Sequence, residues 1–265
     1  MAADEITRIV RIAVSLGIEG MKLTGGEPLV RRDIIKIVKD LAKIRGLKDL
    51  SMTTNGTLLS PLAHDLHRAG LKRVNISLPT LNEEVFRRLT GGNVQDAMNG
   101  VKAAVAAGFR PVKLNMLLLR GTNDSSVPDM IEFATKTGTI LQLIELEPIN
   151  MSDSFYLANH EPLDEYADML KEKAVEIETR RFMQNRQVYH LPDVVVEVVR
   201  PIENTEFCLH CSRLRITSDG KLKPCLMRND NLVDILTPLR TGASDEQLEE
   251  LFRLANQKRE PFNRN

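Results

Sequence analysis

Residues 50–78, LSMTTNGTLLSPLAHDLHRAGLKRVNISL, form the stretch that decides the fold. The apolar run Leu50 to Thr54 predicts a strand that ends at Asn55-Gly56, a pair typical of turns. Ser60-Pro61 then predicts the start of a helix that ends at Gly70, because serine caps helices and proline suits their first turn. The run Arg73 to Leu78 predicts a second strand. The stretch is therefore a strand–helix–strand unit, the kind that builds parallel sheets.

The same alternation extends in both directions along the chain. Helices are predicted over Asp4 to Leu16, Asp33 to Gly46, Asn82 to Leu89, Val94 to Ala107, Pro128 to Thr135, Leu163 to Ile177 and Ser244 to Lys258. Further strands are predicted over Met21 to Thr24, Val112 to Leu119, Leu141 to Leu146 and Val194 to Val199. The last helix begins with a capping-box pattern formed by Ser244 and Gln247.

Five strands in series, joined by helices, favour an α/β fold that is either an open barrel or a doubly wound sheet. The pattern weakens after residue 150, so we expect one domain over 1–150 and a second, α+β domain over 151–265. The helix over Asp4 to Leu16 has no strand before it. Either a first strand is missing, or this helix only packs at the N-terminus.

The composition excludes several classes of protein. The chain has 265 residues, with 36 basic and 36 acidic side chains, so its net charge of zero argues against a general nucleic-acid coat. Aromatic residues make up 4% of the chain and tryptophan is absent, which argues against a platform for stacking bases. The sequence has neither a membrane-spanning apolar run nor a signal-peptide pattern, so we expect a cytoplasmic protein without a membrane partner.

The three cysteines of the chain are Cys208, Cys211 and Cys225. An odd number cannot all form disulfides, and their close spacing favours a metal or cluster site. A zinc site would need a fourth ligand such as His210, whereas a [4Fe–4S] cluster with three cysteines leaves one iron open to a substrate atom. Three inert cysteines are the remaining alternative. Asp219-Gly220 predicts a tight turn between two short strands that separate Cys211 from Cys225.

Polar residues gather near the strand ends, where parallel sheets bind ligands. Thr24-Gly25-Gly26-Glu27-Pro28 follows one strand, and its glycines allow a ligand to approach the backbone closely. Arg213-Leu214-Arg215 places two guanidinium groups on one face of a strand, an arrangement that suits phosphate or carboxylate. Each pattern alone is also compatible with an ordinary turn or an exposed cationic strand.

Together these motifs resemble those of the GTP 3′,8-cyclases, radical SAM enzymes of molybdenum cofactor (molybdopterin) biosynthesis. Lys22 to Asp33 is similar to the loop that binds S-adenosylmethionine (SAM) in that family. Thr53 to Gly56 and Val74 to Leu78 resemble its next two motifs. Phe207 to Leu226 resembles its C-terminal cluster motif.

The resemblance implies a partial (βα) TIM-type barrel and a C-terminal α+β domain that carries a [4Fe–4S] cluster and binds GTP. In the family, a second, N-terminal cluster cleaves SAM to a radical that abstracts the ribose 3′ hydrogen of GTP. The ribose carbon then attacks C8 of guanine and gives (8S)-3′,8-cyclo-7,8-dihydroguanosine 5′-triphosphate. The implied partner is cyclic pyranopterin monophosphate synthase, which acts next, and a homodimer is compatible with the family.

The resemblance also implies roles for individual residues. Cys208, Cys211 and Cys225 would ligate the C-terminal cluster. SAM would contact Gly25, Gly26, Glu27 and Ser77. GTP would contact Lys22, Thr53, Lys113, Arg213, Leu214 and Arg215. Lys22 departs from the arginine that is common in the family, which replaces a bidentate fork with a point charge.

No cysteine precedes Cys208, so the family's N-terminal Cys-x3-Cys-x2-Cys motif is absent and the chain offers no catalytic cluster ligands. We therefore expect an N-terminally truncated cyclase that lacks the first barrel strand and is inactive alone. The N-terminal cluster is expected only in the full-length protein. Two alternatives are a non-catalytic homologue that binds GTP and a cluster, and a zinc-stabilised α/β binding protein.

Overall fold

The computed structural model describes residues 1–149, 151–180, 183, 185–201 and 205–260. Among these residues the main sheet has eight strands, in the order β1-β2-β3-β4-β5-β8-β7-β6. The strands are β1 Gly20–Leu23, β2 Asp49–Thr54, β3 Arg73–Ser77, β4 Val112–Leu117, β5 Ile140–Ile144, β6 Glu176–Arg180, β7 Arg186–His190 and β8 Val195–Val199. Neighbouring strands from β1 through β5 to β8 are parallel, whereas β6 and β7 form an antiparallel hairpin that extends the sheet from β8.

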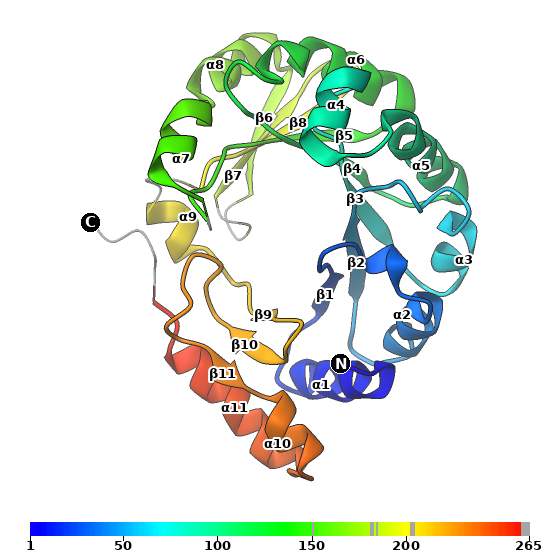
Figure 1. Ribbon diagram of the computed structural model, residues 1–265, viewed down its shortest axis with the longest axis vertical. Coiled ribbons are helices and arrows are strands. Elements are labelled where there is room, and N and C mark those ends of the chain that lie inside the picture. Colours follow the sequence, from blue (N-terminus) through cyan, green and yellow to red (C-terminus); the bar gives the residue numbers. More distant parts are fainter. Residues whose placement is uncertain (150, 181–182, 184, 202–204, 261–265) are drawn as a thin grey trace.

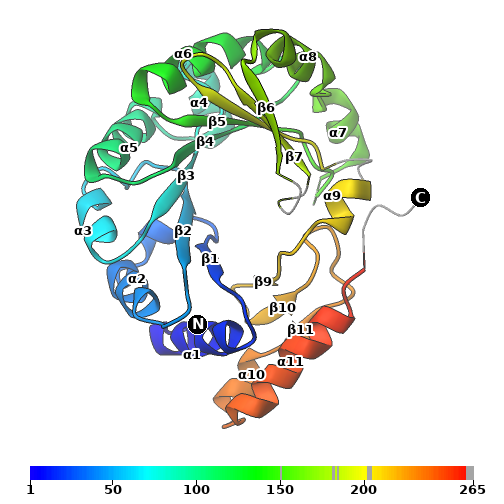
Figure 2. The same cartoon turned by 180° about the vertical axis from the view of Figure 1, so that it is seen from behind.

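The first five strands follow one another in chain order, without the reversal that defines a doubly wound sheet. Figures 1 and 2 show a sheet that curves, with its helices on the outside. These helices are α1 Ala3–Ser15, α2 Ile34–Ala42, α3 Ala63–Arg68, α4 Glu83–Thr90, α5 Val94–Ala107, α6 Val127–Thr137, α7 Asp153–Asn159 and α8 Asp164–Lys173. The predicted mixed α/β fold with a parallel-rich sheet is therefore confirmed.

Side-chain alternation along the strands divides the sheet into two unlike faces. Met52, Val74 and Leu114 are fully buried between the sheet and its helices, where they belong to the main hydrophobic core. Helix α2 contributes Ile37 and Leu41 to the same core from one apolar face. The opposite strand positions carry polar residues such as Asn75, Lys113 and Gln142, so the inner face of the curve is polar.

Two predicted helix boundaries are wrong, and three elements were not predicted. The helix expected to start at Ser60-Pro61 begins at Ala63. Two tight turns precede it, because the Leu59 amide donates to the Gly56 carbonyl and the Leu62 amide donates to the Leu59 carbonyl. The helix expected to reach Ile177 ends at Lys173, since the following residues pair with β7 as a strand. Helix α7 and strands β6 and β7 were not predicted.

The C-terminal part forms a smaller layer next to α1. Its elements are α9 Thr205–Leu209, β9 Arg215–Ile216, β10 Lys221–Lys223, β11 Val233–Asp234, α10 Leu236–Arg240 and α11 Asp245–Gln257. The predicted hairpin around Asp219-Gly220 is confirmed by the antiparallel pairing of β9 with β10, and the predicted capping box by hydrogen bonds between Ser244 and Gln247. A second hydrophobic core joins α1 to α11 and to the small sheet β9–β11.

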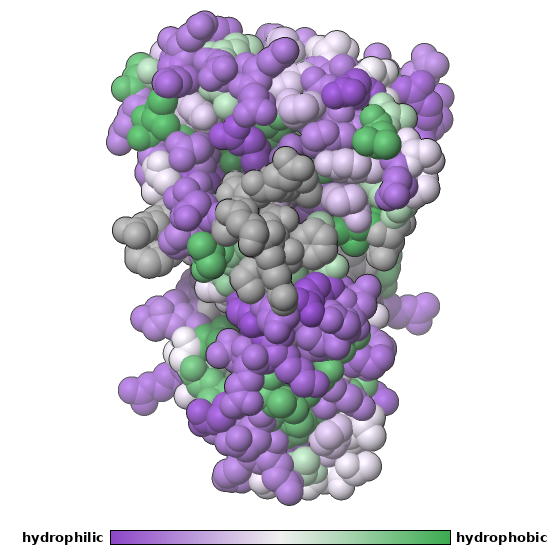
Figure 3. Space-filling view, turned by 90° about the vertical axis from the view of Figure 1, so that its left-hand side faces the viewer, coloured by the Kyte–Doolittle hydropathy of each residue, from purple (hydrophilic) through white to green (hydrophobic). Residues whose placement is uncertain are grey.

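Hydrophilic residues surround smaller apolar groups on the face of the molecule in Figure 3. Among the described residues, no helix has both the length and the apolar character needed to cross a membrane.

Candidate functional site

The strand register aligns polar residues in rows across the inner face of the sheet. Thr53 on β2 is level with Asn75 on β3, and Asn75 is level with Lys113 on β4. A second row begins at Ser77 and continues through Asn115 and Gln142 to Glu197 on β8. Thus the structure brings together residues that the sequence places on separate strands.

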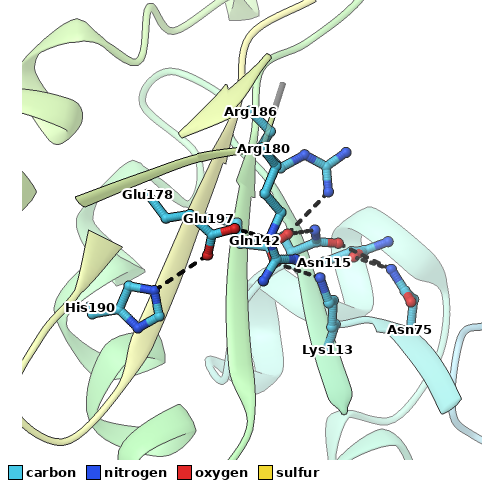
Figure 4. Close-up of polar contacts among 9 residues, drawn as sticks. All are labelled: Asn75, Lys113, Asn115, Gln142, Glu178, Arg180, Arg186, His190 and Glu197. Carbon is cyan, nitrogen blue, oxygen red and sulfur yellow. Dashed lines mark hydrogen bonds and ion pairs between the residues drawn. The ribbon is translucent and has the colours of Figure 1, made fainter. Parts of the chain in front are cut away.

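A buried carboxylate lies at the centre of this polar face (Figure 4). Glu197 is completely buried and accepts a hydrogen bond from Lys113 Nζ at 2.5 Å. It also accepts hydrogen bonds from Arg180 at 2.9 Å, from Arg186 at 3.0 Å and from the amide of Gln142. One carboxylate is therefore shared by three cations that come from β4, β6 and β7.

These contacts control the charges of the network. Burial alone would raise the pKa of Glu197, but Lys113 and Arg186 outweigh burial and hold it at about 2. Burial lowers the pKa of Lys113. Glu197 opposes that shift only in part, because the charges of Arg180 and Arg186 also lower the pKa of Lys113. We infer that Lys113 keeps its proton through the direct hydrogen bond to Glu197, and positive charge then exceeds negative charge in the network.

Two further cations predicted from the sequence act on the same region. Lys22 on β1 is open to solvent, yet desolvation by the surrounding protein, followed by the charge of Arg213, lowers its pKa to about 8. Desolvation and the charges of Arg186 and Arg215 lower the pKa of Arg213 to about 10. Cations that lie close together and have lowered pKa values are stabilised in their charged form when an anion binds among them. The arrangement therefore suits a polyanionic ligand.

Affinity for inorganic tripolyphosphate is expected to fall as the pH rises from 7.5 to 9. Lys22, with a pKa of about 8, loses its charge over that range. The loss should approach about tenfold, since about a tenth of such a group stays protonated one unit above its pKa. Isothermal titration calorimetry at several pH values measures this dependence. Lys22→Arg, which stays charged, should show a much smaller fall than the parent over the same range, and an unchanged pH dependence in that variant would contradict the assignment to Lys22.

The predicted SAM-binding residues lie at the C-terminal ends of β1 and β3. Gly25 has a φ of +146°, and space is open beside both Gly25 and Gly26, so a ligand could reach the backbone there. Ser77, the last residue of β3, is exposed. These three positions are open to a ligand, as their predicted role requires.

Glu27 has a structural function at this edge. Its Oε1 accepts hydrogen bonds from the Leu29 amide at 3.0 Å and from the Thr54 hydroxyl at 2.7 Å, and its Oε2 accepts one from the Asn55 amide at 2.7 Å. The carboxylate therefore joins the loop after β1 to the end of β2. A ligand contact would be additional to these bonds, since a carboxylate has about four acceptor positions.

The cysteines lie in the C-terminal part, close to the predicted arginines. Cys208 is on α9, Cys211 follows it in a turn, and Cys225 follows β10; all three are half-buried and none forms a disulfide. Arg259 donates hydrogen bonds to the carbonyls of Cys211 and Arg213, which fixes this segment against the end of α11. Within the described parts of the chain, no group of three or more His, Cys, Asp or Glu side chains could hold a metal ion. The three thiols are therefore not a ready ligand set as they stand.

Sequence reasoning did not identify Arg180, Arg186, Gln142 or Glu197. A signal was present for two of them: Glu197 interrupts a run of valines on β8, and Gln142 interrupts an apolar run on β5. A lone polar residue inside an apolar strand is costly to bury unless it finds partners. Arg180 and Arg186 gave no comparable signal.

Comparison with known families assigns the chain to a family. Residues 1–134 match the Radical SAM superfamily, and residues 139–264 match Molybdenum Cofactor Synthesis C. These matches indicate a protein of the radical SAM class. Over 269 residues the chain is 49% identical to the probable GTP 3′,8-cyclase of Thermococcus kodakarensis, covering 99% of this chain and 86% of that protein. It is 44% identical over 263 residues to the protein of the same name from Methanocaldococcus jannaschii, with the same coverage. The chain belongs to the GTP 3′,8-cyclase family of the radical SAM superfamily.

Solved structures show the same fold at low sequence identity. Streptococcus suis SuiB superimposes with a TM-score of 0.62 at 14% identity, over 85% of this chain and 54% of SuiB. HydG, a maturase of the [FeFe]-hydrogenase, superimposes with a TM-score of 0.53 at 16% identity, over 66% of this chain and 42% of HydG. The chain thus spans about half the length of these proteins or less, and the likeness concerns the fold alone.

Proposed function

We propose that this protein acts in the GTP 3′,8-cyclase reaction of molybdenum cofactor biosynthesis, in which SAM-derived radical chemistry converts GTP to (8S)-3′,8-cyclo-7,8-dihydroguanosine 5′-triphosphate. The 265-residue chain lacks cysteines for the cluster that cleaves SAM and is expected to be inactive alone. The observation that carries the proposal is the set of crowded cations on the inner face, in a chain 49% identical to a probable GTP 3′,8-cyclase. A triphosphate is the part of GTP that such cations would bind.

In this proposal each end of the nucleotide has its own residues. Lys22, Lys113 and Arg213 hold the phosphates, with Arg215 beside them. Thr53 and Leu214 contact the nucleoside. Gly25, Gly26 and Ser77 contact SAM at the open strand ends, and Glu27 holds that loop in place through its three hydrogen bonds.

Membership of the radical SAM superfamily implies a [4Fe–4S] cluster and SAM, which together supply the radical when bound. We propose that Cys208, Cys211 and Cys225 ligate the C-terminal cluster, which is distinct from the cluster that cleaves SAM; their close spacing and the absence of a disulfide among them support this role. Because the thiols are not gathered in the structure, binding a cluster would have to draw them together. The chain has no other cysteine for a second cluster.

The proposal also covers the barrel, the domain division, the compartment and the partners of the protein. The curved sheet, whose first five strands follow one another in chain order, fits a partial (βα) barrel. The two family matches divide the chain between residues 134 and 139, whereas strands β6 to β8, which lie after residue 150, extend the main sheet. Cysteines that form no disulfide fit a reducing compartment such as the cytoplasm. The product would pass to cyclic pyranopterin monophosphate synthase, and a homodimer is compatible with the proposal.

Nucleotide selectivity tests the proposed function. In anaerobic calorimetry the 265-residue chain should bind GTP at least tenfold more tightly than ATP, because the proposed site contacts the base as well as the phosphates. With SAM and dithionite, this chain should form no 5′-deoxyadenosine, since it lacks cysteines for the cluster that cleaves SAM. Equal affinity for ATP and GTP would contradict the substrate assignment, and 5′-deoxyadenosine above background would contradict the need for a second cysteine motif.

A further inference from the structure

Glu197 has more cationic partners than a single carboxylate can neutralise. Its Oε1 accepts from Lys113 and Arg180, and its Oε2 accepts from Arg186 and Gln142. The two oxygens thereby separate the cations and fix their positions (Figure 4).

The second carboxylate near these cations lies at the edge of the network. Glu178, which is about half exposed, contacts Arg180 at 3.4 Å and lies 3.7 Å from His190. Lys113 is 3% exposed and Arg186 is 7% exposed, so solvent screens neither of them well. In the ion pairs of the described residues, Lys113, Arg180 and Arg186 share the two carboxylates of Glu197 and Glu178.

We propose that Glu197 is a positioning residue that gathers Lys113, Arg180 and Arg186 into one anion-binding cluster for the triphosphate of the substrate. The identity of the nucleotide rests on the proposed function, whereas the cluster itself rests on the contacts above. Two members of the cluster, Arg180 and Arg186, come from the β6–β7 hairpin. The hairpin would therefore bind the same ligand as the parallel strands.

Loss of the Glu197 charge should disperse the cluster. Lys113, Arg180 and Arg186 come from three different strands and repel one another, so a common anion is needed to hold them at one point. Without it, Arg180, which is 28% exposed, can turn toward water. Lys113, which is buried, would give up its proton more readily. Fewer cations would then face the ligand, even though a competing negative charge had been removed.

Binding of inorganic tripolyphosphate to the 265-residue chain tests this role by calorimetry. Glu197→Gln is expected to weaken tripolyphosphate and GTP binding at least tenfold, and Glu197→Asp, which keeps the charge, should recover most of the affinity. Glu145→Gln is the matched control, because it removes another buried carboxylate, one that pairs with His160 instead. It should leave tripolyphosphate binding unchanged.

The outcomes separate the possibilities. Equal or tighter tripolyphosphate binding by Glu197→Gln would overturn the proposal, because Glu197 would then only compete with the ligand. If circular dichroism shows that Glu197→Gln does not fold, Arg180→Gln carries the test, since its partly exposed side chain is not needed for the core. A several-fold loss of affinity supports the proposal, and no loss overturns it. If the unmodified chain binds tripolyphosphate but does not prefer GTP, only the nucleotide assignment is refuted. If the unmodified chain does not bind tripolyphosphate, the anion-binding cluster is refuted.

Discussion

Anaerobic reconstitution with iron and sulfide is expected to load about four irons per chain, and Cys225→Ser is expected to abolish that loading. The three cysteines are the only ones in the sequence, and each is half-buried and forms no disulfide. A [4Fe–4S] cluster with two remaining protein thiolates would lose a third of its ligands, so the loss should be nearly complete. Iron analysis and the visible absorption of the cluster measure the result.

His210 provides a matched control for this experiment. It lies between Cys208 and Cys211, but its Nδ1 is 2.9 Å from the carbonyl oxygen of Glu206 in its own helical turn. A cluster held by three cysteines should therefore survive His210→Ala with its iron unchanged. A tetrahedral zinc site that uses His210 should lose its metal in the same variant. One zinc per chain without iron would refute the cluster, and no bound metal of either kind would leave the cysteines as inert residues.

The second large effect is expected from Gly100→Ala in the middle of α5. Alanine in place of glycine usually stabilises a helix by about 1 kcal/mol. Here a Cβ at position 100 would lie 2.1 Å from the carbonyl oxygen of Gly56, a backbone atom that cannot move aside. We therefore expect the opposite sign, a loss of about 2–3 kcal/mol in the free energy of unfolding. Thermal unfolding should show a fall in Tm of about 5–10 °C.

Gly92→Ala is the control for that variant. A Cβ at position 92 would meet Thr90 and Phe86 at 3.4 and 3.5 Å, which is ordinary contact. Its stability should stay within about 0.5 kcal/mol of the parent. A Tm for Gly100→Ala equal to or above that of the parent would show that α5 does not pack directly on the turn at Gly56. That turn follows Thr53 and Thr54, so the contact also positions the end of β2 in the site.

Local signals explain why the first half of the chain was predictable. Helix α5 has the predicted bounds because Asn93 caps its start and Gly108, in the left-handed conformation, ends it. The hairpin of β9 and β10 likewise follows from one tight turn. Strand β6 shows the limit of this reasoning, since Glu176–Arg180 is largely exposed and lacks an apolar alternation. Its strand conformation depends on pairing with β7, which local sequence does not reveal.

The sequence by itself determined the order of helices and strands from α1 to β5, the clustering of the cysteines and the family motifs, because each depends on residues close together in the chain. Only the tertiary structure decided that Lys113 and Glu197, 84 residues apart, form one ion pair with Arg180 and Arg186 around them. Their contact depends on strand order and register across the curved sheet. The cost of burying a shared carboxylate is offset only when all of these strands are in place. The net charge of the chain is zero, yet the fold gathers these cations on the inner face of the sheet.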